Sequence, residues 1–528
     1  MKVIDLMKKS IAYLWAGIVL FIGLCVLILP SFIEYYCKKH FTLPNAVVFL
    51  IDLVFISATV FVAIRYGKRL ERALDKFVSR GFVIVLAAAL FLVQLYIARN
   101  IYFLTGWDAG MVFDSAVSMS QGGVANEQYF TSYPNNLLIT FLYSFILKVN
   151  NAVGILPENE GVFAIIAFQC MLFAVCAYLV YSVCYELTKR KTVSLLAFAV
   201  FFLLIGLSPW VVIPYSDSTG IIFPILIFRI YQLSARARGR VRPAVLWGVN
   251  ALVSYIGFKI KPQLVIMFIA VVIVEVFRTA FLRRKDLKLL KKGLTNIVAC
   301  VLVLVIAAAA FSVFCSTQTS IKLDEEREMG AAHIFMMGMN GKTYGGYLDS
   351  DILFSMSFDT KAERDRENMR VAFERIQEMG FFGLVNHTVR KSLANFGDGS
   401  FAWGVEGRFY DEVLPEPNAS VAPWLRSLYY NDGDNYRLFE DSMQAIWLAV
   451  LIFSGTAVLY IKRNKGKNGL EASLLVLSLI GLALFEALFE ARARYLMTYA
   501  PIFIICAVIG LYTLTRFIRE KFVKCSEE

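Results

Sequence analysis

Long apolar segments constrain this 528-residue chain more than any other feature, because 58% of its residues are hydrophobic and only 18% are charged. A helix needs about 20 apolar residues to cross roughly 30 Å of hydrocarbon. The sequence therefore predicts an all-α polytopic membrane protein with about 12 transmembrane helices. The predicted spans are 11–30, 45–65, 81–103, 162–186, 192–213, 219–234, 244–258, 264–282, 294–315, 443–461, 470–488 and 496–515.

Basic loops predict the orientation of these spans. Lys and Arg are concentrated in cytoplasmic loops of membrane proteins. We predict that the protein lies in the plasma membrane. With twelve spans, every basic cluster and both termini then fall on the cytoplasmic side. One miscounted span would place half of the clusters outside. The clusters are Lys2 with Lys8 and Lys9, Lys68–Arg80, Lys189–Lys191, Arg236–Arg242, Arg283–Lys292, Lys462–Lys467 and Arg516–Lys524.

The segment 137–149 is the doubtful case, with only thirteen apolar residues. Counting it as a span would move the cluster Lys189–Lys191 outside. We therefore predict a helix that lies in, or dips into, the outer interface.

Three parts follow from this topology. Residues 1–315 form an N-terminal transmembrane catalytic module with an outer loop at 105–161, residues 316–441 an extracytoplasmic domain, and residues 442–528 the C-terminal transmembrane helices. The stretch 316–441 carries 13 Lys+Arg and 21 Asp+Glu, whereas the rest of the chain carries 40 and 20. It is predicted to be mixed or mainly helical, with an amphipathic helix at Lys361–Met379 and a second helix at 381–396.

Two acids are candidates for chemistry on the outer side. Asp108, in Thr105-Gly-Trp-Asp-Ala-Gly110, follows the third span. It either caps a helix that begins at Ala109 or acts as a general base in a partly dry site. Asp217, in Tyr-Ser-Asp-Ser, either caps the sixth span or points toward the same site as a second acid.

The turn Tyr133-Pro-Asn135-Asn136 lies about twenty-five residues after Asp108. An X-Pro turn followed by Asn is typical of an extended segment that enters a helix with Asn as its cap. The two amides are also suited to holding a sugar.

Four cations lie against the positive-inside trend. Lys259 and Lys261 fall in one outer turn, and Arg492 and Arg494 in another, next to Tyr495. Long basic side chains near helix ends often extend to the interface. A cation at membrane depth is costly unless an anion accompanies it. A lipid phosphate is the anion found at that depth, and the forked donors of Arg suit phosphate oxygens.

Several site classes find no support in the sequence. His40, His333 and His387 are scattered and have no Cys/His pairing, so no zinc site is predicted. The chain has no Walker-type loop and no dinucleotide fingerprint. We therefore expect neither a nucleotide site nor nucleic-acid binding.

The ordered set of an outer-loop acid, a Pro-containing turn, a later outer Asp, an outer Lys-Pro turn (Gly257–Pro262) and a late Arg-Tyr pair (Glu490–Tyr495) resembles the GT-C superfamily of membrane glycosyltransferases. It is most similar to the protein O-mannosyltransferase and aminoarabinose transferase type, which uses polyprenyl-phosphate-linked sugars. The resemblance covers most of the membrane part. The chain departs from the family at Ala109, where a second acid is common, and at Pro134-Asn-Asn-Leu137, where Pro-Pro-Leu is common.

The resemblance implies a catalytic base at Asp108, a lining acid at Asp217 and a lipid-phosphate contact at Lys259 or Lys261. Arg492, Arg494 and Tyr495 match the late basic element of the family and are predicted to bind substrate. It implies an inverting transfer from a polyprenyl-phosphate donor to a cell-surface acceptor, which is a wall polymer, glycolipid or protein. No cofactor is certain, and a divalent cation is possible. A lipid-linked sugar flippase or transporter, a glycan polymerase or ligase, and a structural membrane protein are the alternatives.

Overall fold

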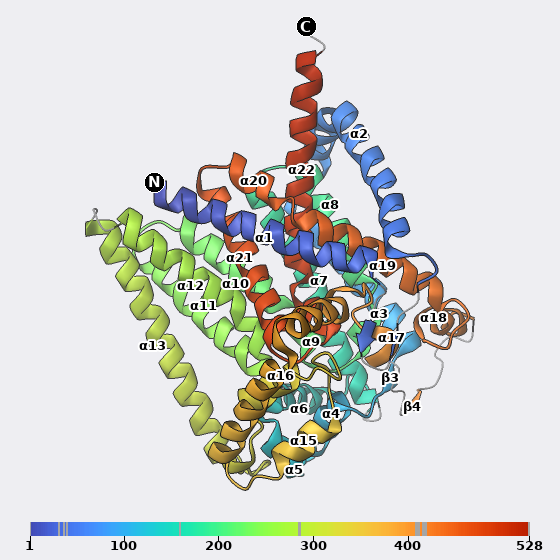
Figure 1. Ribbon diagram of the computed structural model, residues 1–528, viewed down its shortest axis with the longest axis vertical. Coiled ribbons are helices and arrows are strands. Elements are labelled where there is room, and N and C mark those ends of the chain that lie inside the picture. Colours follow the sequence, from blue (N-terminus) through green and yellow to red (C-terminus); the bar gives the residue numbers. More distant parts are fainter. Residues whose placement is uncertain are drawn as a thin grey trace.

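The computed structural model describes residues 2–29, 32–34, 37–38, 41–157, 160–283, 287–406, 412–413 and 420–525. Within these residues the chain is predominantly helical (Figure 1). Two short antiparallel pairs are also present, β1 (Phe32–Glu34) with β2 (Cys37–Lys38), and β3 (Phe103–Leu104) with β4 (Glu412–Val413). The predicted all-α polytopic class is confirmed.

Twelve helical segments of the described chain are long and apolar enough to cross a membrane. They contain α1 (Lys2–Ile28), α2 (Asn45–Phe77), α3 (Arg80–Ile101), α6 (Leu137–Val153), α7 (Gly161–Thr188), α10 (Ile222–Arg236), α11 (Val241–Ile260), α12 (Ile266–Arg278), α13 (Leu287–Thr317), α19 (Tyr436–Ser454), α21 (Lys467–Leu488) and α22 (Ala500–Cys525).

Shorter helices connect and cover the long ones. They are α4 (Asp108–Ser120), α5 (Glu127–Ser132), α8 (Lys191–Phe201), α9 (Ser216–Gly220), α14 (Ala331–Gly338), α15 (Asp349–Met356), α16 (Lys361–Phe396), α17 (Trp403–Glu406), α18 (Ala422–Tyr429) and α20 (Ala457–Arg463). The short 3₁₀ or π helices are η1 (Pro134–Asn136), η3 (Phe202–Gly206), η4 (Pro209–Val212), η5 (Pro262–Val265), η6 (Thr279–Arg283), η7 (Glu325–Arg327) and η8 (Ala493–Tyr499).

The helices divide into a packed centre and an exposed rim. In α21 and α22, 61% of the most apolar window is buried within the protein, but in α13 and α2 the figures are 6% and 0%. Figure 1 shows α13 along one flank and α2 near the end that carries the C-terminus. Apolar helices with such exposure are suited to face lipid tails.

The basic clusters gather at one end of the bundle, called here the basic end. Lys8 Nζ donates to the Lys465 carbonyl (3.3 Å), and Lys191 Nζ forms an ion pair with Asp75 at 3.4 Å. Lys292 Nζ donates to the Ala237 carbonyl (3.2 Å). These contacts join chain segments far apart in sequence, in agreement with the predicted common side. Part of the predicted cluster Arg283–Lys292, namely 284–286, lies outside the described residues.

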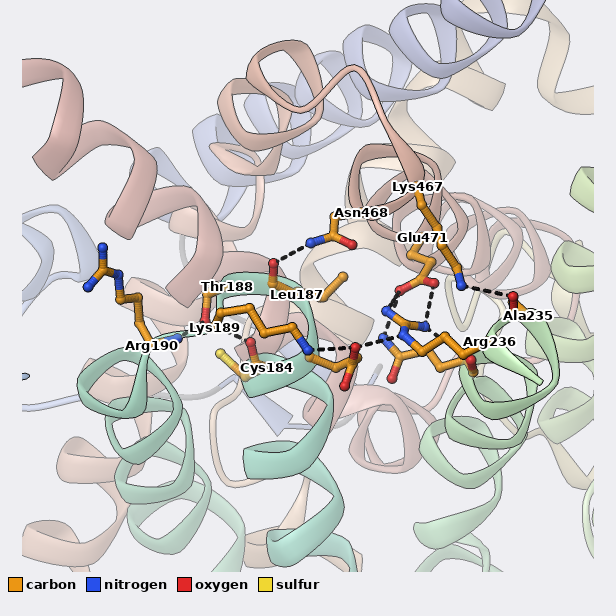
Figure 2. A network of polar contacts seen from close by, with 12 residues as sticks. Cys184, Leu187, Thr188, Lys189, Arg190, Ala235, Arg236, Lys467, Asn468 and Glu471 are labelled. Atoms are coloured by element: carbon orange, nitrogen blue, oxygen red, sulfur yellow. Dashed lines mark hydrogen bonds and ion pairs between the residues drawn. The ribbon is translucent and has the colours of Figure 1, made fainter. Parts of the chain in front are cut away.

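The half-buried Arg236 joins α7, α10 and α21 at this end through two acids (Figure 2). Arg236 donates to both carboxylate oxygens of Glu471, at 2.7 and 3.1 Å, and to Glu186 at 2.6 Å. Asn468 Nδ2 of α21 donates to the Leu187 carbonyl of α7 at 2.7 Å. Arg236 and Lys467 are each matched by an acid or a carbonyl, as burial of charge requires.

The predicted spans differ from the helices that are long enough to cross a membrane at two places, α6 and α8. By length and composition, the twelve include α6 and omit the shorter Lys191–Gly206, whereas we predicted the reverse. The Lys191 amide donates to Glu71 at the basic end (2.7 Å), and Trp210 Nε1 donates to the Ser400 carbonyl in the stretch 316–441 (3.0 Å). The chain between Lys191 and Trp210 therefore passes from one end of the bundle to the other.

Both ends of α6, in contrast, lie at the end opposite the basic end, called here the site end. Before α6, Asn136 Nδ2 donates to the Tyr129 hydroxyl (2.7 Å). After it, Glu160 forms an ion pair at 2.7 Å with Arg99, in the last turn of α3. These contacts agree with the predicted interfacial helix, although α6 has the length and composition of a span.

The stretch 316–441 contains the predicted pair of helices. They form the two halves of α16, which meet at Gly380, where φ is 57° and the helix is interrupted. Glycine adopts this left-handed conformation without the steric penalty of a Cβ. The Thr360 hydroxyl caps the first half by accepting a hydrogen bond from the Glu363 amide (3.3 Å). Figure 1 shows α15 and α16 near α4, α5 and α6 at the site end.

Low pH should destabilise the stretch 316–441, because two buried imidazoles in it resist protonation. His333 Nδ1 lies 2.7 Å from the Ser355 hydroxyl, and His387 Nε2 lies 3.0 Å from the Gly338 carbonyl. The other ring nitrogen of each is buried without a hydrogen-bond partner in the described structure. Burial lowers the pKa of both histidines.

An unfolded chain therefore binds more protons than the folded one below about pH 6.5, and stability falls as the pH drops through that range. The protection factors of amides in α14–α16, which correct for the slower intrinsic exchange at low pH, should fall between pH 7.5 and pH 5. The double variant His333→Gln with His387→Gln should lose part of this dependence. Equal protection factors in the wild type at both pH values would contradict the prediction.

Candidate functional site

The loop before α4 turns so tightly that it requires a glycine. A Cβ on Gly110 would lie 2.1 Å from the carbonyl oxygen of Thr105, too close for any side chain. This close approach sets the path of Trp107 and Asp108 at the start of α4. The helix begins at Asp108 and is flanked by Trp107, with no side-chain cap.

The carboxylate of Asp108 accepts hydrogen bonds from two tyrosines. Tyr129 Oη donates to Oδ1 (3.0 Å), and Tyr215 Oη donates to Oδ2 (3.4 Å). The alternative that Asp108 caps a helix starting at Ala109 is therefore wrong. Asp108 is half-buried and held in place by two hydroxyls from α5 and from the residue before α9.

Tyr129 connects Asp108 to the predicted Pro-containing turn. Its hydroxyl accepts a hydrogen bond from Asn136 Nδ2 (2.7 Å). Asn136 occupies the predicted N-cap position of α6, but its side chain makes no capping hydrogen bond to this helix. Burial raises the pKa of Tyr129, and the charge of Asp108 raises it further, so this hydroxyl keeps its proton and remains a donor. The ring of Tyr133 packs against that of Tyr129, with centroids 5.4 Å apart.

Asp217 is the centre of a second group. It is 1% exposed and forms an ion pair with Lys261 and a second with Arg494, at 3.7 Å. Lys261 and Arg494 are 7% and 5% exposed. Asp217 lies in the first turn of α9, which has no side-chain cap. The cap alternative is therefore wrong, and Asp217 instead balances two buried cations.

Aromatic rings join the two groups. Lys261 Nζ lies 4.0 Å from the ring centroid of Tyr495. The Arg494 guanidinium lies 4.4 Å from the Trp107 ring and 5.4 Å from the Tyr215 ring. Tyr215 thus contacts both Asp108 and Arg494. Such cation–π contacts stabilise cations that are withdrawn from water.

The late basic turn supplies a third part. Glu490 accepts hydrogen bonds from Arg492 Nε (3.1 Å) and from the Tyr495 hydroxyl (2.9 Å). Burial opposes ionisation of Glu490, but Arg492 and Tyr495 outweigh it and lower the pKa of this carboxyl below its usual value. Arg492 also lies 5.9 Å from the ring of Tyr347, in the stretch 316–441.

Two of the predicted site residues are not brought into this arrangement. Lys259 lies 5.0 Å from the ring of Phe311 in α13, away from the Asp217 group. Asn135 is exposed, and its amide donates only to the neighbouring Asn136 (3.3 Å). The other eight predicted residues lie in the three connected groups.

Sequence reasoning missed Tyr129, Tyr215, Trp107, Glu490 and Glu486. Glu486 is 1% exposed in α21, and neither of its carboxylate oxygens has a hydrogen-bond partner in the described chain. Glu486 and Glu490 were visible as two acids in the apolar sequence Phe485-Glu-Ala-Leu-Phe-Glu490, which is unusual at membrane depth. The aromatic residues gave no such signal.

Lys391 of α16 attaches the stretch 316–441 to this site. It is 2% exposed, and its Nζ donates to the carbonyls of Gly338 (2.9 Å), Ala487 (3.1 Å) and Phe489. Burial lowers its pKa to about 7. The Ala491 amide also donates to the Gly345 carbonyl (2.8 Å). The stretch therefore holds the backbone from which Glu490 and Arg492 extend.

A resident metal does not fit the described side chains. No three His, Cys, Asp or Glu residues among them gather closely enough to ligate one ion. The acids at the site are instead held by hydroxyl and cationic groups. His40 lies outside the described residues.

Replacing Gly110 by alanine should destabilise the protein, although the change adds only one methyl group. In Gly110→Ala, the new methyl group meets the Thr105 carbonyl, so the loop has to move. We expect a loss of about 1–3 kcal/mol, typical of overpacking. Gly67→Ala, where a Cβ meets nothing within 4 Å, is the control and should leave stability unchanged or slightly raised. Thermal unfolding of the two purified variants checks this, and equal midpoints would contradict it.

A family model described as "conserved hypothetical integral membrane protein" matches residues 3–513. A comparison with curated proteins finds no match. The match extends from α1 into α22 and so includes all three groups of the site. The chain therefore belongs to this family of conserved hypothetical integral membrane proteins.

Proposed function

We propose that this protein is an inverting glycosyltransferase that moves a sugar from a polyprenyl-phosphate donor to a cell-surface acceptor. The observation that carries the proposal is the connection of Asp108 to the cations Arg494 and Lys261 through Tyr215, Trp107 and Asp217. A base beside buried cations is the pair of groups that such a transfer needs.

Asp108 is the proposed general base. It takes the proton of an acceptor hydroxyl as that oxygen attacks the anomeric carbon of the donor sugar. The bond between this carbon and the phosphate oxygen breaks, and the lipid phosphate leaves with the electron pair. Direct attack from the face opposite the phosphate inverts the anomeric centre. Tyr129 and Tyr215 orient the carboxylate.

The cations are the proposed partners of the leaving phosphate. Arg494 and Lys261 already face Asp217, which keeps them ordered before a donor binds. Negative charge develops on the phosphate as the bond breaks, and fixed cations stabilise that charge without reorganisation. Arg492 lies on the same turn and is the third proposed phosphate partner. Since the donor is already an activated phosphate ester, the reaction requires no nucleotide site.

We assign the site end to the extracytoplasmic face and both termini to the cytoplasm. The basic end gathers Lys8, Lys191, Arg236 and Lys467, which the positive-inside trend places in the cytoplasm. A donor lipid in the outer leaflet then has its phosphate near Arg494.

The test uses proteoliposomes with polyprenyl-phosphate sugars. The sugar of each donor carries a label. Two quantities are measured: the transfer of labelled sugar to a mixed acceptor fraction, and the movement of intact donor between the leaflets. Transfer that requires Asp108 supports the glycosyltransferase. Movement of intact donor without cleavage would instead make the protein a flippase.

A further inference from the structure

A cavity of about 190 Å³ lies at the basic end, far from the site just described. It is enclosed by the last turns of α10 and α12, an early turn of α11 and the first turns of α13. An engineered cavity of about 150 Å³ holds benzene, so this one has room for a phosphate and a few further atoms. Because α13 is at the exposed rim, the cavity adjoins the surface that faces lipid.

Two cations from different helices line the cavity, Arg278 of α12 and Lys292 of α13. Glu275, one turn before Arg278, accepts a hydrogen bond from the Arg278 guanidinium at 3.4 Å. That distance is longer than the usual 2.7–2.9 Å of a charge-assisted hydrogen bond, so an added anion can compete for the guanidinium. Lys292 Nζ donates to the Ala237 carbonyl at 3.2 Å, which aims it across the end of α10.

The uncharged lining is suited to the rest of a lipid headgroup. Tyr231 and Trp247 meet edge to face with centroids 6.3 Å apart, and both are buried. Aromatic residues with a polar edge are common at the depth of headgroups. Asn296 is 4% exposed, and its Oδ1 has no hydrogen-bond partner in the described chain. This oxygen is placed to accept a hydrogen bond from a hydroxyl.

The described groups next to the lining add a further cation. Glu471, the nearest other acid on α21, is already engaged by both terminal nitrogens of Arg236. Lys467 of the same helix donates to the Ala235 carbonyl, beside the cavity, at 2.9 Å. Basic cavities between membrane helices at the cytoplasmic side are typical binding sites for anionic headgroups.

We propose that this cavity binds the phosphate of an anionic membrane lipid. Arg278 and Lys292 contact the phosphate, and Asn296 accepts a hydrogen bond from a headgroup hydroxyl. The acyl chains lie along α13 on its lipid-facing flank. The proposal is independent of the sugar transfer at the opposite end.

Native mass spectrometry of the full-length protein tests it. The probes are phosphatidylglycerol, phosphatidylcholine and inorganic phosphate. We expect phosphatidylglycerol to bind at least tenfold more tightly than phosphatidylcholine, and this preference to be lost in Arg278→Ala with Lys292→Ala. The matched control is Arg240→Ala with Lys291→Ala, which removes the same charges from exposed positions outside the cavity lining.

A second variant keeps both cations. Ala235→Leu adds volume at the cavity wall and should also weaken phosphatidylglycerol binding, which separates loss of the site from loss of charge or fold. Phosphatidylglycerol bound equally by the wild type, the double-alanine variant and Ala235→Leu would overturn the proposal. Displacement of the lipid by equimolar inorganic phosphate would assign the cavity to free phosphate and overturn the lipid assignment.

Discussion

Replacing Asp108 by Asn should lower transfer by about 10²–10⁴-fold, the range that a general base contributes. The amide keeps the shape of the side chain and still accepts a hydrogen bond from Tyr129 or Tyr215, so the fold should persist. It is not basic enough to take a proton from the acceptor hydroxyl. The measurement is transfer of labelled sugar by proteoliposomes that contain equal amounts of folded protein.

The control for this variant lies on the same helix. Asp114 is an exposed acid six residues after Asp108 in α4, and Asp114→Asn removes the same charge. It should retain wild-type activity. Full transfer by Asp108→Asn would remove the base from the proposed mechanism, and equal loss in both variants would mean that charge on α4 matters rather than Asp108 itself.

Asp217→Asn should destabilise the fold by about 3–5 kcal/mol, because it leaves two buried cations without their acid. Lys261 and Arg494 would lose the carboxylate that pairs with both of them and would keep their contacts with the rings of Tyr495, Trp107 and Tyr215. A neutral amide still donates and accepts hydrogen bonds, so the loss measures charge rather than shape.

Thermal and denaturant unfolding in detergent measure this loss. Asp359→Asn, at an exposed acid before α16, is the matched control and should stay within about 0.5 kcal/mol of the wild type. Lys261→Met should cost less than Asp217→Asn, since it leaves the pair of Asp217 and Arg494 intact. An Asp217→Asn variant as stable as the control would show that these ion pairs contribute nothing net.

Most of the spans were predictable because apolar length and basic loops are both local features of the sequence. The interfacial placement of α6 stays a prediction, because α6 also has the length and composition of a span. The helix break at Gly380 was anticipated as the gap between two predicted helices. Its left-handed conformation gives the physical reason for that gap.

The site was predictable only in part. Lys259 and Lys261 are two residues apart and equivalent in sequence. In the structure Lys259 lies in the last turn of α11 and faces α13, whereas Lys261 follows the helix in extended conformation and reaches Asp217. A boundary of one residue decides this, and helix ends are the least certain part of sequence reasoning.

The cap assignments failed for a different reason. Asp108 and Asp217 both lie at helix starts, where Asp commonly caps. Long-range partners took both carboxylates instead: Tyr215 lies 107 residues from Asp108, and Lys261 lies 44 residues from Asp217. The chain has 25 tyrosines, and nothing in the sequence distinguishes Tyr129 or Tyr215 from the others.

Mass spectrometry of surface glycans is the decisive test of whether the protein transfers a sugar to the cell surface. Cells that lack the protein are compared with cells that express the wild type or Asp108→Asn at equal levels. We expect one sugar to be absent from a surface polymer, glycolipid or protein in cells that lack the protein. The wild type should restore this sugar, and Asp108→Asn should not. Identical glycans in all three strains, or restoration by Asp108→Asn, would contradict it.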